Sequence, residues 1–411
     1  MKQSTSNISL KYKSFLREGL NYLGQLTSQL MDLNNSRGPG VGNLKSDFNV
    51  DELLERPPVE VNLEEIAAQL QGKVVLVTGG GGSIGSELCR QIIQLRPKKL
   101  LILDHSELNL YLIDSELSQL KSMVPTEIIL ADIKDGTVMR NIFDCYRPDF
   151  VYHAAAYKHV HLVEKNPYTS IMNNILGTRN LIDCSLNFSV EAFVMISTDK
   201  AVNPSSVMGS TKRVCELLVT EAALKSNKRF CSVRFGNVLG SSGSLIPLLK
   251  KQVISGGPVT ITHPEMTRYF MSISEAVKLV LKAGQISRPG DVNILRMGSS
   301  VKIVDIAKQV INLMGRSLEE VPIVYIGIRP GEKLHEELYL CGNETPTEHK
   351  DIMVLPNGDA VYNPDLFAGK DLRNVVSRLL AYSTRKDEEA LKLLTRLVFM
   401  HRREKQLEEA I

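Results

Sequence analysis

The stretch Lys73–Gly85, which reads KVVLVTGGGGSIG, decides the fold of this chain. From Lys73 to Thr78 it is a short, β-branched apolar run, which predicts a buried parallel strand. Glycines follow at once, and Ser86–Leu95 then carries apolar residues at helical spacing. Only glycine lets the backbone turn so tightly and approach a pyrophosphate, and the helix N-terminus then offers free N–H groups. The stretch therefore predicts a dinucleotide-binding strand–turn–helix unit.

The glycines of this turn, Gly79, Gly82 and Gly85, have the spacing G-x-x-G-x-x-G, with Ser83 and Ile84 between the last two. Asp104 stands about 20 residues further on, at the end of the next predicted strand. A carboxylate there binds the adenosine ribose hydroxyls and repels a 2′-phosphate. We therefore expect NAD in preference to NADP, although Ser106 or a distant basic residue could accommodate a phosphate.

Strand and helix patterns alternate after the glycine turn. Strands are predicted at Lys99–Leu103, Glu127–Leu130, Phe150–His153 and Ala192–Ser197, and helices at Glu107–Leu120, Val138–Cys145 and Ser170–Leu186. The alternation predicts a doubly wound parallel α/β sheet of the Rossmann type. We expect an N-terminal helical extension (1–48), the dinucleotide-binding domain (49–250), a smaller substrate-binding lobe (251–350, part of which returns to the first domain) and a C-terminal helical extension (351–411).

Three segments outside this alternation carry weaker patterns. Lys13–Leu33 has leucines at helical spacing and predicts an amphipathic helix that docks on the body or on a partner subunit, with a membrane-surface helix as the alternative. Asp371–Glu409 predicts a solvated helical pair or an assembly surface. Phe235–Leu249 is rich in Gly, Ser and Asn and predicts a loop.

The composition excludes several classes of protein. Among 411 residues, 49 Lys and Arg face 46 Asp and Glu, and the net charge of +3 is too small to argue for nucleic acid or an anionic membrane. No apolar run is long enough to predict a transmembrane segment. The six cysteines are widely spread without a CxxC pair, which is typical of a reducing, cytoplasmic location. His159 and His161 flank Val160 and predict loop packing, so we expect no metal.

Several motifs together resemble the extended short-chain dehydrogenase/reductase superfamily, whose glycine spacing is TGxxGxxG. Asp132-Ile133 resembles its adenine-contacting pair, Ala154-Ala155-Ala156 its nicotinamide-side segment, and Asn174 lies in a stretch similar to its NVxGT helix. The resemblance implies that all six residues bind the cofactor.

Longer segments narrow the resemblance to the polysaccharide-biosynthesis UDP-N-acetylglucosamine 4,6-dehydratases. They are HAAAYKHVHLVE (153–164), STDKAVNPSSVMGSTKR (197–213), RFGNVLGSSGS (234–244), TRYFM (267–271) and RPGEKLHEEL (329–338). The resemblance covers roughly residues 50–345. Long members of that family carry a membrane region, so we expect this chain to be a soluble, shortened relative.

The resemblance implies an internal redox reaction through bound NAD, with Asp199 as the acid at the C6 hydroxyl and Lys200 as the base at C5. Lys200 then needs a depressed pKa to act near neutral pH. Lys212 would grip the nicotinamide ribose, but Met208 stands where the superfamily's YxxxK dyad has tyrosine. A thioether carries no proton, so Thr198 is our first candidate for the group that takes the C4 hydroxyl proton.

Substrate contacts also follow from the resemblance. The residues that match positions lining the sugar nucleotide are Lys158, Asn237, Ser241, Ser244, Arg268, Arg329 and Glu332. A planar guanidinium suits a diphosphate, which favours Arg329 for that group. The expected partners are a UDP-sugar and further copies of this chain in a homo-oligomer. A 4-epimerase, a dehydratase of another nucleotide sugar and a non-catalytic dinucleotide sensor remain as alternatives.

Overall fold

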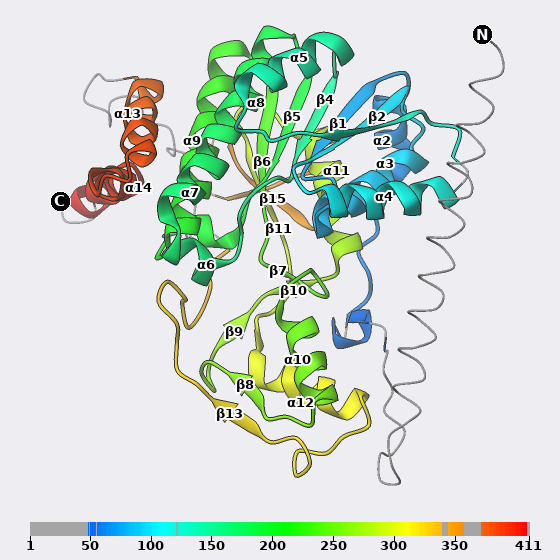
Figure 1. The fold of residues 1–411 in the computed structure, drawn as a ribbon, viewed down its shortest axis with the longest axis vertical. Coiled ribbons are helices and arrows are strands. Elements are labelled where there is room, and N and C mark those ends of the chain that lie inside the picture. Colours follow the sequence, from blue (N-terminus) through cyan, green and yellow to red (C-terminus); the bar gives the residue numbers. More distant parts are fainter. Residues whose placement is uncertain are drawn as a thin grey trace, which may run out of the picture.

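A nine-stranded sheet forms the larger part of the protein, above a smaller lobe (Figure 1). This computed structural model describes residues 48, 50–54, 56–120, 122–338, 344–356 and 371–408. The strand order is β14-β15-β11-β6-β5-β4-β1-β2-β3. The strands are β1 (Val74–Thr78), β2 (Lys99–Asp104), β3 (Thr126–Leu130), β4 (Phe150–His153), β5 (Ala192–Ile196), β6 (Arg229–Arg234), β11 (Val292–Leu295), β14 (Thr345–Pro346) and β15 (Ile352–Leu355).

The order of the strands places a crevice above β1. This strand pairs in parallel with β2 on one side and with β4 on the other, so the chain reverses its direction of winding there. In such sheets, ligands bind outside the carboxyl ends of the strands at this switch point. The predicted doubly wound α/β sheet is confirmed, and the predicted strands at β1 to β5 agree with the observed bounds to within one residue.

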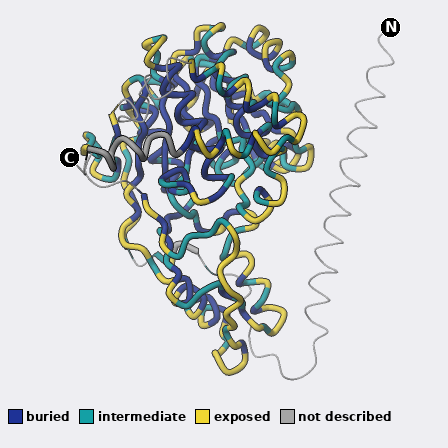
Figure 2. The backbone as a smooth tube through the Cα atoms, turned by 90° about the vertical axis from the view of Figure 1, so that its left-hand side faces the viewer, coloured by how far each residue is buried: buried dark blue, intermediate teal, exposed yellow. Residues whose placement is uncertain are grey.

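Helices cover both faces of the sheet because side chains of successive strand residues point to opposite faces. Val75 and Val77 of β1 lie in one hydrophobic cluster, and Leu76 lies in the other. The first cluster includes residues of α2 (Leu63–Leu70), α3 (Ser83–Gln94), α4 (Glu107–Gln119) and α11 (Ile273–Ile286). The second includes residues of α5 (Gly136–Tyr146), α8 (Gly177–Asn187) and α9 (Val207–Ser226). Figure 2 shows the buried strands inside these layers.

The smaller lobe has a hydrophobic cluster of its own. Its helices are α10 (Leu245–Ile254) and α12 (Ile303–Leu313), and its short strands are β8 (Val259–Ile261), β9 (Thr267–Arg268), β12 (Val301–Lys302) and β13 (Ile323–Tyr325). The strand pair β7 (Asn237–Val238) and β10 (Phe270–Met271) connects it to the sheet region. The predicted loop at 235–249 is wrong at β7 and again from Leu245 onward. Ile246, Leu249 and Val253 form an apolar stripe that packs in the lobe's cluster and stabilises α10.

The C-terminal segment folds onto the sheet domain as two helices, α13 (Leu372–Thr384) and α14 (Glu389–Glu408). Leu379 and Leu394 are buried in the same cluster as Val214 of α9, and both helices lie beside α9 in Figure 1. The predicted helices are confirmed, but the pair is not solvated all round, because its apolar stripe is packed. The predicted helix at Lys13–Leu33 lies outside the described residues. Among those that are described, no helix has the length and apolarity to cross a bilayer.

Candidate functional site

The glycine turn packs without room for side chains. Gly79 has a φ of +69°, and a Cβ on it would stand 2.6 Å from the backbone nitrogen of Ala155. A Cβ on Gly85 would stand 1.9 Å from the carbonyl oxygen of Gly79. The turn therefore brings β1, the start of α3 and the alanine segment after β4 into backbone contact. The N–H groups that begin α3 remain available to an anionic ligand.

A cavity of about 170 Å³ lies beside this turn at the ends of β2 and β3. Asp104, Asp132 and Ile133 line it together with Gly79, Gly82 and all three alanines 154–156. Asp104 accepts hydrogen bonds from the N–H groups of Gly81 (3.0 Å) and Ser106 (2.9 Å), which fix its carboxylate at the cavity wall. The structure thus brings the predicted adenosine-side residues together.

Asn174 is placed differently from the other predicted cofactor residues. Its side chain accepts from the N–H of Tyr157 (2.8 Å) and donates to the Tyr157 carbonyl (3.2 Å) and to Thr211 Oγ1 (3.0 Å). It lies in the π-helical turn η2 (Met172–Leu176) and is buried. Asn174 lines none of the three cavities around the site and instead braces the loop that follows β4.

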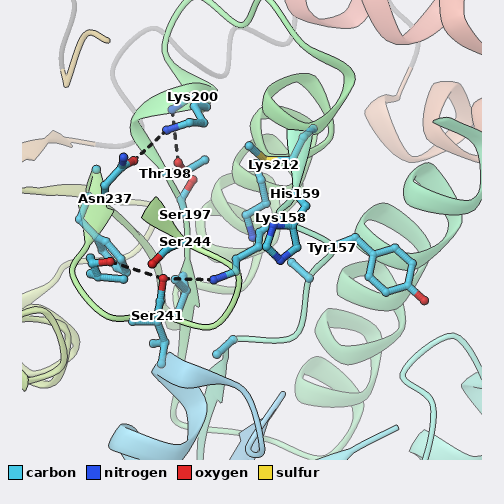
Figure 3. Close-up of a pocket in the computed structure, with 18 of the residues that line it drawn as sticks. Tyr157, Lys158, His159, Ser197, Thr198, Lys200, Lys212, Asn237, Ser241 and Ser244 are labelled. Atoms are coloured by element: carbon cyan, nitrogen blue, oxygen red, sulfur yellow. Dashed lines mark hydrogen bonds between the residues drawn. The ribbon is translucent and has the colours of Figure 1, made fainter. Parts of the chain in front are cut away.

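A central cavity of about 300 Å³ is lined by many of the predicted catalytic and substrate-binding residues (Figure 3). Its walls include Lys158, Thr198, Lys200, Met208, Lys212, Asn237, Ser241 and Ser244. Ile84 and two of the alanines also line it, so it adjoins the glycine turn. Residues from β5, α9, β7 and the start of α10 meet here because all four elements end or begin at the carboxyl edge of the sheet.

Lys200 lines this wall and forms an ion pair with Asp199, which is fully buried and is not part of the cavity lining. They belong to the 3-10 turn η3 (Asp199–Ala201), directly after β5. The buried Oδ1 of Asp199 accepts from Thr198 Oγ1 (2.8 Å) and from Lys200 Nζ (3.0 Å). Its other oxygen, Oδ2, is buried and has no hydrogen-bond partner among the described residues. Lys200 Nζ also donates to Asn237 Oδ1 (3.3 Å).

The pKa of Lys200 is shifted upward, whereas a base that acts near neutral pH needs a lowered pKa. Burial lowers its pKa, but the carboxylates of Asp199 and Glu336 raise it, and the net pKa lies above the ordinary value. Burial alone therefore does not depress this pKa as expected, because the two carboxylates raise it by more than burial lowers it. Burial does lower the pKa of Lys212 and of Lys158, the other amines at the cavity.

A buried ion pair that sequence reasoning missed lies behind this wall. Glu216 on α9 accepts from Ser197 Oγ (2.6 Å) and from both ends of the Arg234 guanidinium (2.7 Å each). Burial alone would raise the pKa of Glu216, but Arg234, Arg213 and Ser197 outweigh it and hold the pKa at about 2. The pair ties β5 to β6 and α9, so it fixes the residue that precedes Thr198.

The predicted arginines do not line the central cavity. Arg268 is buried and donates to the carbonyls of Thr267 (2.7 Å), Leu334 (3.1 Å) and Lys333 (2.9 Å). Arg329 is exposed in its loop, where its carbonyl accepts from the N–H of Glu332 (3.1 Å). Arg268 therefore holds the 333–334 segment, and neither Arg329 nor Glu332 contacts the predicted catalytic residues.

Two neighbouring residues that the motifs did not assign complete the walls. Tyr157 and His159 line both the central cavity and a further one of about 530 Å³ over the glycine turn. His159 lies against Gly243, where a Cβ would stand 2.7 Å from Cε1 of the imidazole. Ser83 Oγ accepts from the N–H of Ser242 (3.0 Å), which joins the glycine turn to the loop before α10.

Comparison with known proteins agrees with this geometry. A family model described as polysaccharide biosynthesis protein matches residues 75–357. The capsular polysaccharide biosynthesis protein CapD of Staphylococcus aureus is 51% identical over 300 residues, which are 72% of this chain and 50% of that protein. The chain thus spans about half the length of the first curated relatives it matches.

A more distant relative is named for the reaction that it catalyses. A UDP-N-acetylglucosamine 4,6-dehydratase (inverting) of Campylobacter jejuni is 35% identical over 274 residues, which are 64% of this chain and 77% of that enzyme. Among solved structures, Pen from Bacillus thuringiensis is 31% identical, with a TM-score of 0.65 over 70% of this chain and 90% of that one.

Proposed function

Because this chain belongs to the polysaccharide biosynthesis protein family, we propose that it is an NAD-dependent UDP-N-acetylglucosamine 4,6-dehydratase. The observation that carries the proposal is the Thr198–Asp199–Lys200 group: Thr198 and Lys200 line a cavity that adjoins the glycine turn, and the buried Asp199 carboxylate accepts a hydrogen bond from each of them. A hydroxyl, a carboxylate and an amine in mutual contact suit a reaction that moves several protons on one sugar. The product is a UDP-4-keto-6-deoxy sugar for polysaccharide synthesis.

The residues around the glycine turn fit a nicotinamide dinucleotide. The turn leaves no space for a Cβ at Gly85, and the N-terminus of α3 faces the cavity above it. When bound, NAD would take a hydride from sugar C4 and return it to C6, so no external reductant is needed. Asp104 would hold the adenosine ribose, and its buried carboxylate disfavours the 2′-phosphate of NADP.

The proposed proton transfers use only side chains of this chain, and each side chain returns to its starting protonation state. Thr198 passes the C4 hydroxyl proton to Asp199, and Lys200, once neutral, takes the C5 proton. Asp199 then gives its proton to the C6 hydroxyl, which leaves as water, and the Lys200 ammonium returns a proton to C5. Asp199 is again ionised and Lys200 again neutral. The active form therefore carries one proton fewer than the Asp199 carboxylate and Lys200 ammonium of the ion pair.

Met208 lies in the wall beside Lys212, at the position of the superfamily's tyrosine. We assign it no proton, and we assign the ribose of the nicotinamide to Lys212. The free thiols of Cys89, Cys145, Cys184, Cys215 and Cys231 support a reducing, cytoplasmic location. The homo-oligomer stays a prediction.

The test is to incubate the purified chain with UDP-N-acetylglucosamine in deuterated water and identify the product by mass and NMR. We expect loss of one water, deuterium at C5 and none at C6, because the hydrogen at C6 comes from C4. A product of unchanged mass that is epimeric at C4 would identify an epimerase instead. An unaltered substrate would favour the non-catalytic sensor, and deuterium at C6 would contradict the internal hydride transfer.

A further inference from the structure

A second carboxylate, from a segment distant in the chain, faces the ammonium of Lys200. Glu336 lies in the segment that follows the Arg329 loop, and its Oε1 is 3.6 Å from Lys200 Nζ. The whole residue is only 7% exposed, and its Oε2 is buried without a hydrogen-bond partner among the described residues. A buried carboxylate is costly unless it is paired, so this placement requires the neighbouring cations.

Two cations supply that pairing. Besides Lys200, the guanidinium of Arg268 lies 3.8 Å from Glu336 Oε1. Arg268 also binds the carbonyls of Lys333 and Leu334, so it holds the backbone that carries Glu336. The charged groups that act on Lys200 are thus Asp199 and Glu336, which favour the ammonium, and Arg268, which opposes it.

Further contacts dock this segment on the loop after Lys200. Lys333 Nζ donates to the Val202 carbonyl (3.1 Å), Ser205 Oγ donates to the Gly331 carbonyl (3.3 Å), and Asn203 Nδ2 donates to Glu337 Oε2 (2.8 Å). These bonds fix the position of Glu336 relative to η3. The short distance to Lys200 is therefore set by several independent contacts rather than by one flexible side chain.

We propose that Glu336 is a positioning residue that holds the Lys200 ammonium beside Asp199 and keeps Lys200 protonated. The inference deepens the proposed function, because Lys200 is its proposed base. Lys200 must be neutral to take the C5 proton and charged to return one, so a carboxylate that opposes deprotonation sets the pH at which the active form appears. Glu336 touches no reacting atom in this scheme and acts through Lys200.

The test compares the reactivity of Lys200 in matched variants. Only the neutral amine reacts with acetic anhydride, so its labelling rate at a fixed pH near 9, followed by mass spectrometry, reports the neutral fraction. Glu336→Gln keeps the shape and removes the charge, whereas Glu336→Asp keeps the charge and alters the packing. Glu337→Gln is the neighbouring control, because that carboxylate is 48% exposed and contacts Asn203 and Lys333 instead.

We expect Glu336→Gln to label Lys200 about tenfold faster than the wild type, as a fall of one pKa unit requires. In Glu336→Asp and Glu337→Gln, the labelling rate of Lys200 should stay within about twofold of the wild-type rate. Equal acceleration in the Gln and Asp variants of Glu336 would mean that access changed and would overturn the proposal, as would no acceleration in either. If Glu336→Gln does not fold, the Glu336→Asp variant decides alone. Much faster labelling of Lys200 in that variant would overturn the proposal, and labelling at the wild-type rate would support it.

This labelling needs no turnover, so it separates the inference from the proposed function. In an active enzyme, the rising limb of the pH profile of kcat/KM should move to lower pH in Glu336→Gln, because less alkali is needed to free the amine. A chain that does not convert UDP-N-acetylglucosamine defeats the proposed function while the labelling result still decides the role of Glu336.

Discussion

Gly85 lies so close to Gly79 that a Cβ on Gly85 would stand 1.9 Å from the Gly79 carbonyl oxygen. No side-chain rotation relieves a clash with backbone, so any substitution there must displace the turn or the start of α3. Gly79 and Gly82 of this turn also line two cavities. A side chain at Gly85 would therefore displace residues that line both cavities.

The first prediction is that Gly85→Val removes the dinucleotide that we expect to co-purify with the protein. The overpacked turn should also lower the free energy of unfolding by about 1–3 kcal/mol. The measurement is dinucleotide released on denaturation, quantified by mass spectrometry. Gly136→Ala is the control, since its Cβ would meet only the side chain of Asn180, whose nearest atom, Oδ1, would stand 3.4 Å away. Full occupancy in the valine variant would place the cofactor elsewhere.

The second prediction concerns the C4 hydroxyl proton. Thr198→Val keeps the shape of the side chain but loses the hydroxyl that donates to Asp199, so dehydration should slow by roughly ten- to a hundredfold. The cofactor should stay oxidised, because the first step is the one affected. Rapid-mixing absorbance at the NADH band measures this, and Thr198→Ser should restore the rate. Reduction at the wild-type rate in the valine variant would mean that the proton leaves by another route.

The third prediction is that Lys200→Ala stops the reaction one step later. C4 oxidation should proceed, but no base remains for C5, so turnover should fall on the order of a hundredfold or more. Bound cofactor should then accumulate in the reduced form. Lys302→Ala is the control, because Lys302 pairs with Glu265 on the surface of the lobe. Near-normal dehydration would transfer the base role to Lys212 or to a bound water.

The fourth prediction concerns Glu216, whose folded-state pKa of about 2 lies below the ordinary 4.5. A depressed pKa stabilises the fold above pH 4.5, and the contribution is lost as the pH falls toward 2; the full shift is worth roughly 3 kcal/mol. Glu216→Gln removes the charge that pairs with the buried Arg234 guanidinium, so it should destabilise the protein by about 3–5 kcal/mol near pH 7.

Denaturant unfolding of wild type and variant between about pH 6 and pH 3 tests this linkage. The gap between their free energies of unfolding should narrow as the pH falls. Glu60→Gln, at an exposed side chain, should show no such gap. A gap that stays constant over this range would mean that Glu216 does not titrate with folding.

The parts that sequence predicted well depend on local pattern. The strand β4 was predicted to the residue, because a buried parallel strand is a continuous apolar run. Lys200, Lys212 and Ser241 belong to motifs that the resemblance places at one site, and the three residues line one cavity. The helix α10 was missed because its start lies in a run of glycine and serine, and only the packing of the lobe reveals it.

The parts that sequence could not predict depend on partners far apart in the chain. Asp199 and Glu336 together raise the pKa of Lys200 despite its burial, and no local spacing connects Glu336 to Lys200. Arg268 matched a substrate position by motif, but its guanidinium donates to the carbonyls of Lys333 and Leu334, which only the folded protein brings near it. Asn174 was matched to a cofactor position in the same way, yet its amide is used to hold Tyr157.

The central cavity and the cavity over the glycine turn share a wall, which includes Ile84, Ala154, Tyr157, Lys158 and His159. A ligand that shifts these residues as it fills one cavity changes the free energy of filling the other. Thermodynamic reciprocity makes that coupling equal in both directions. If both cavities fill as proposed, the affinity for either ligand depends on the concentration of the other, and the ratio of the affinities with and without the second ligand measures the coupling.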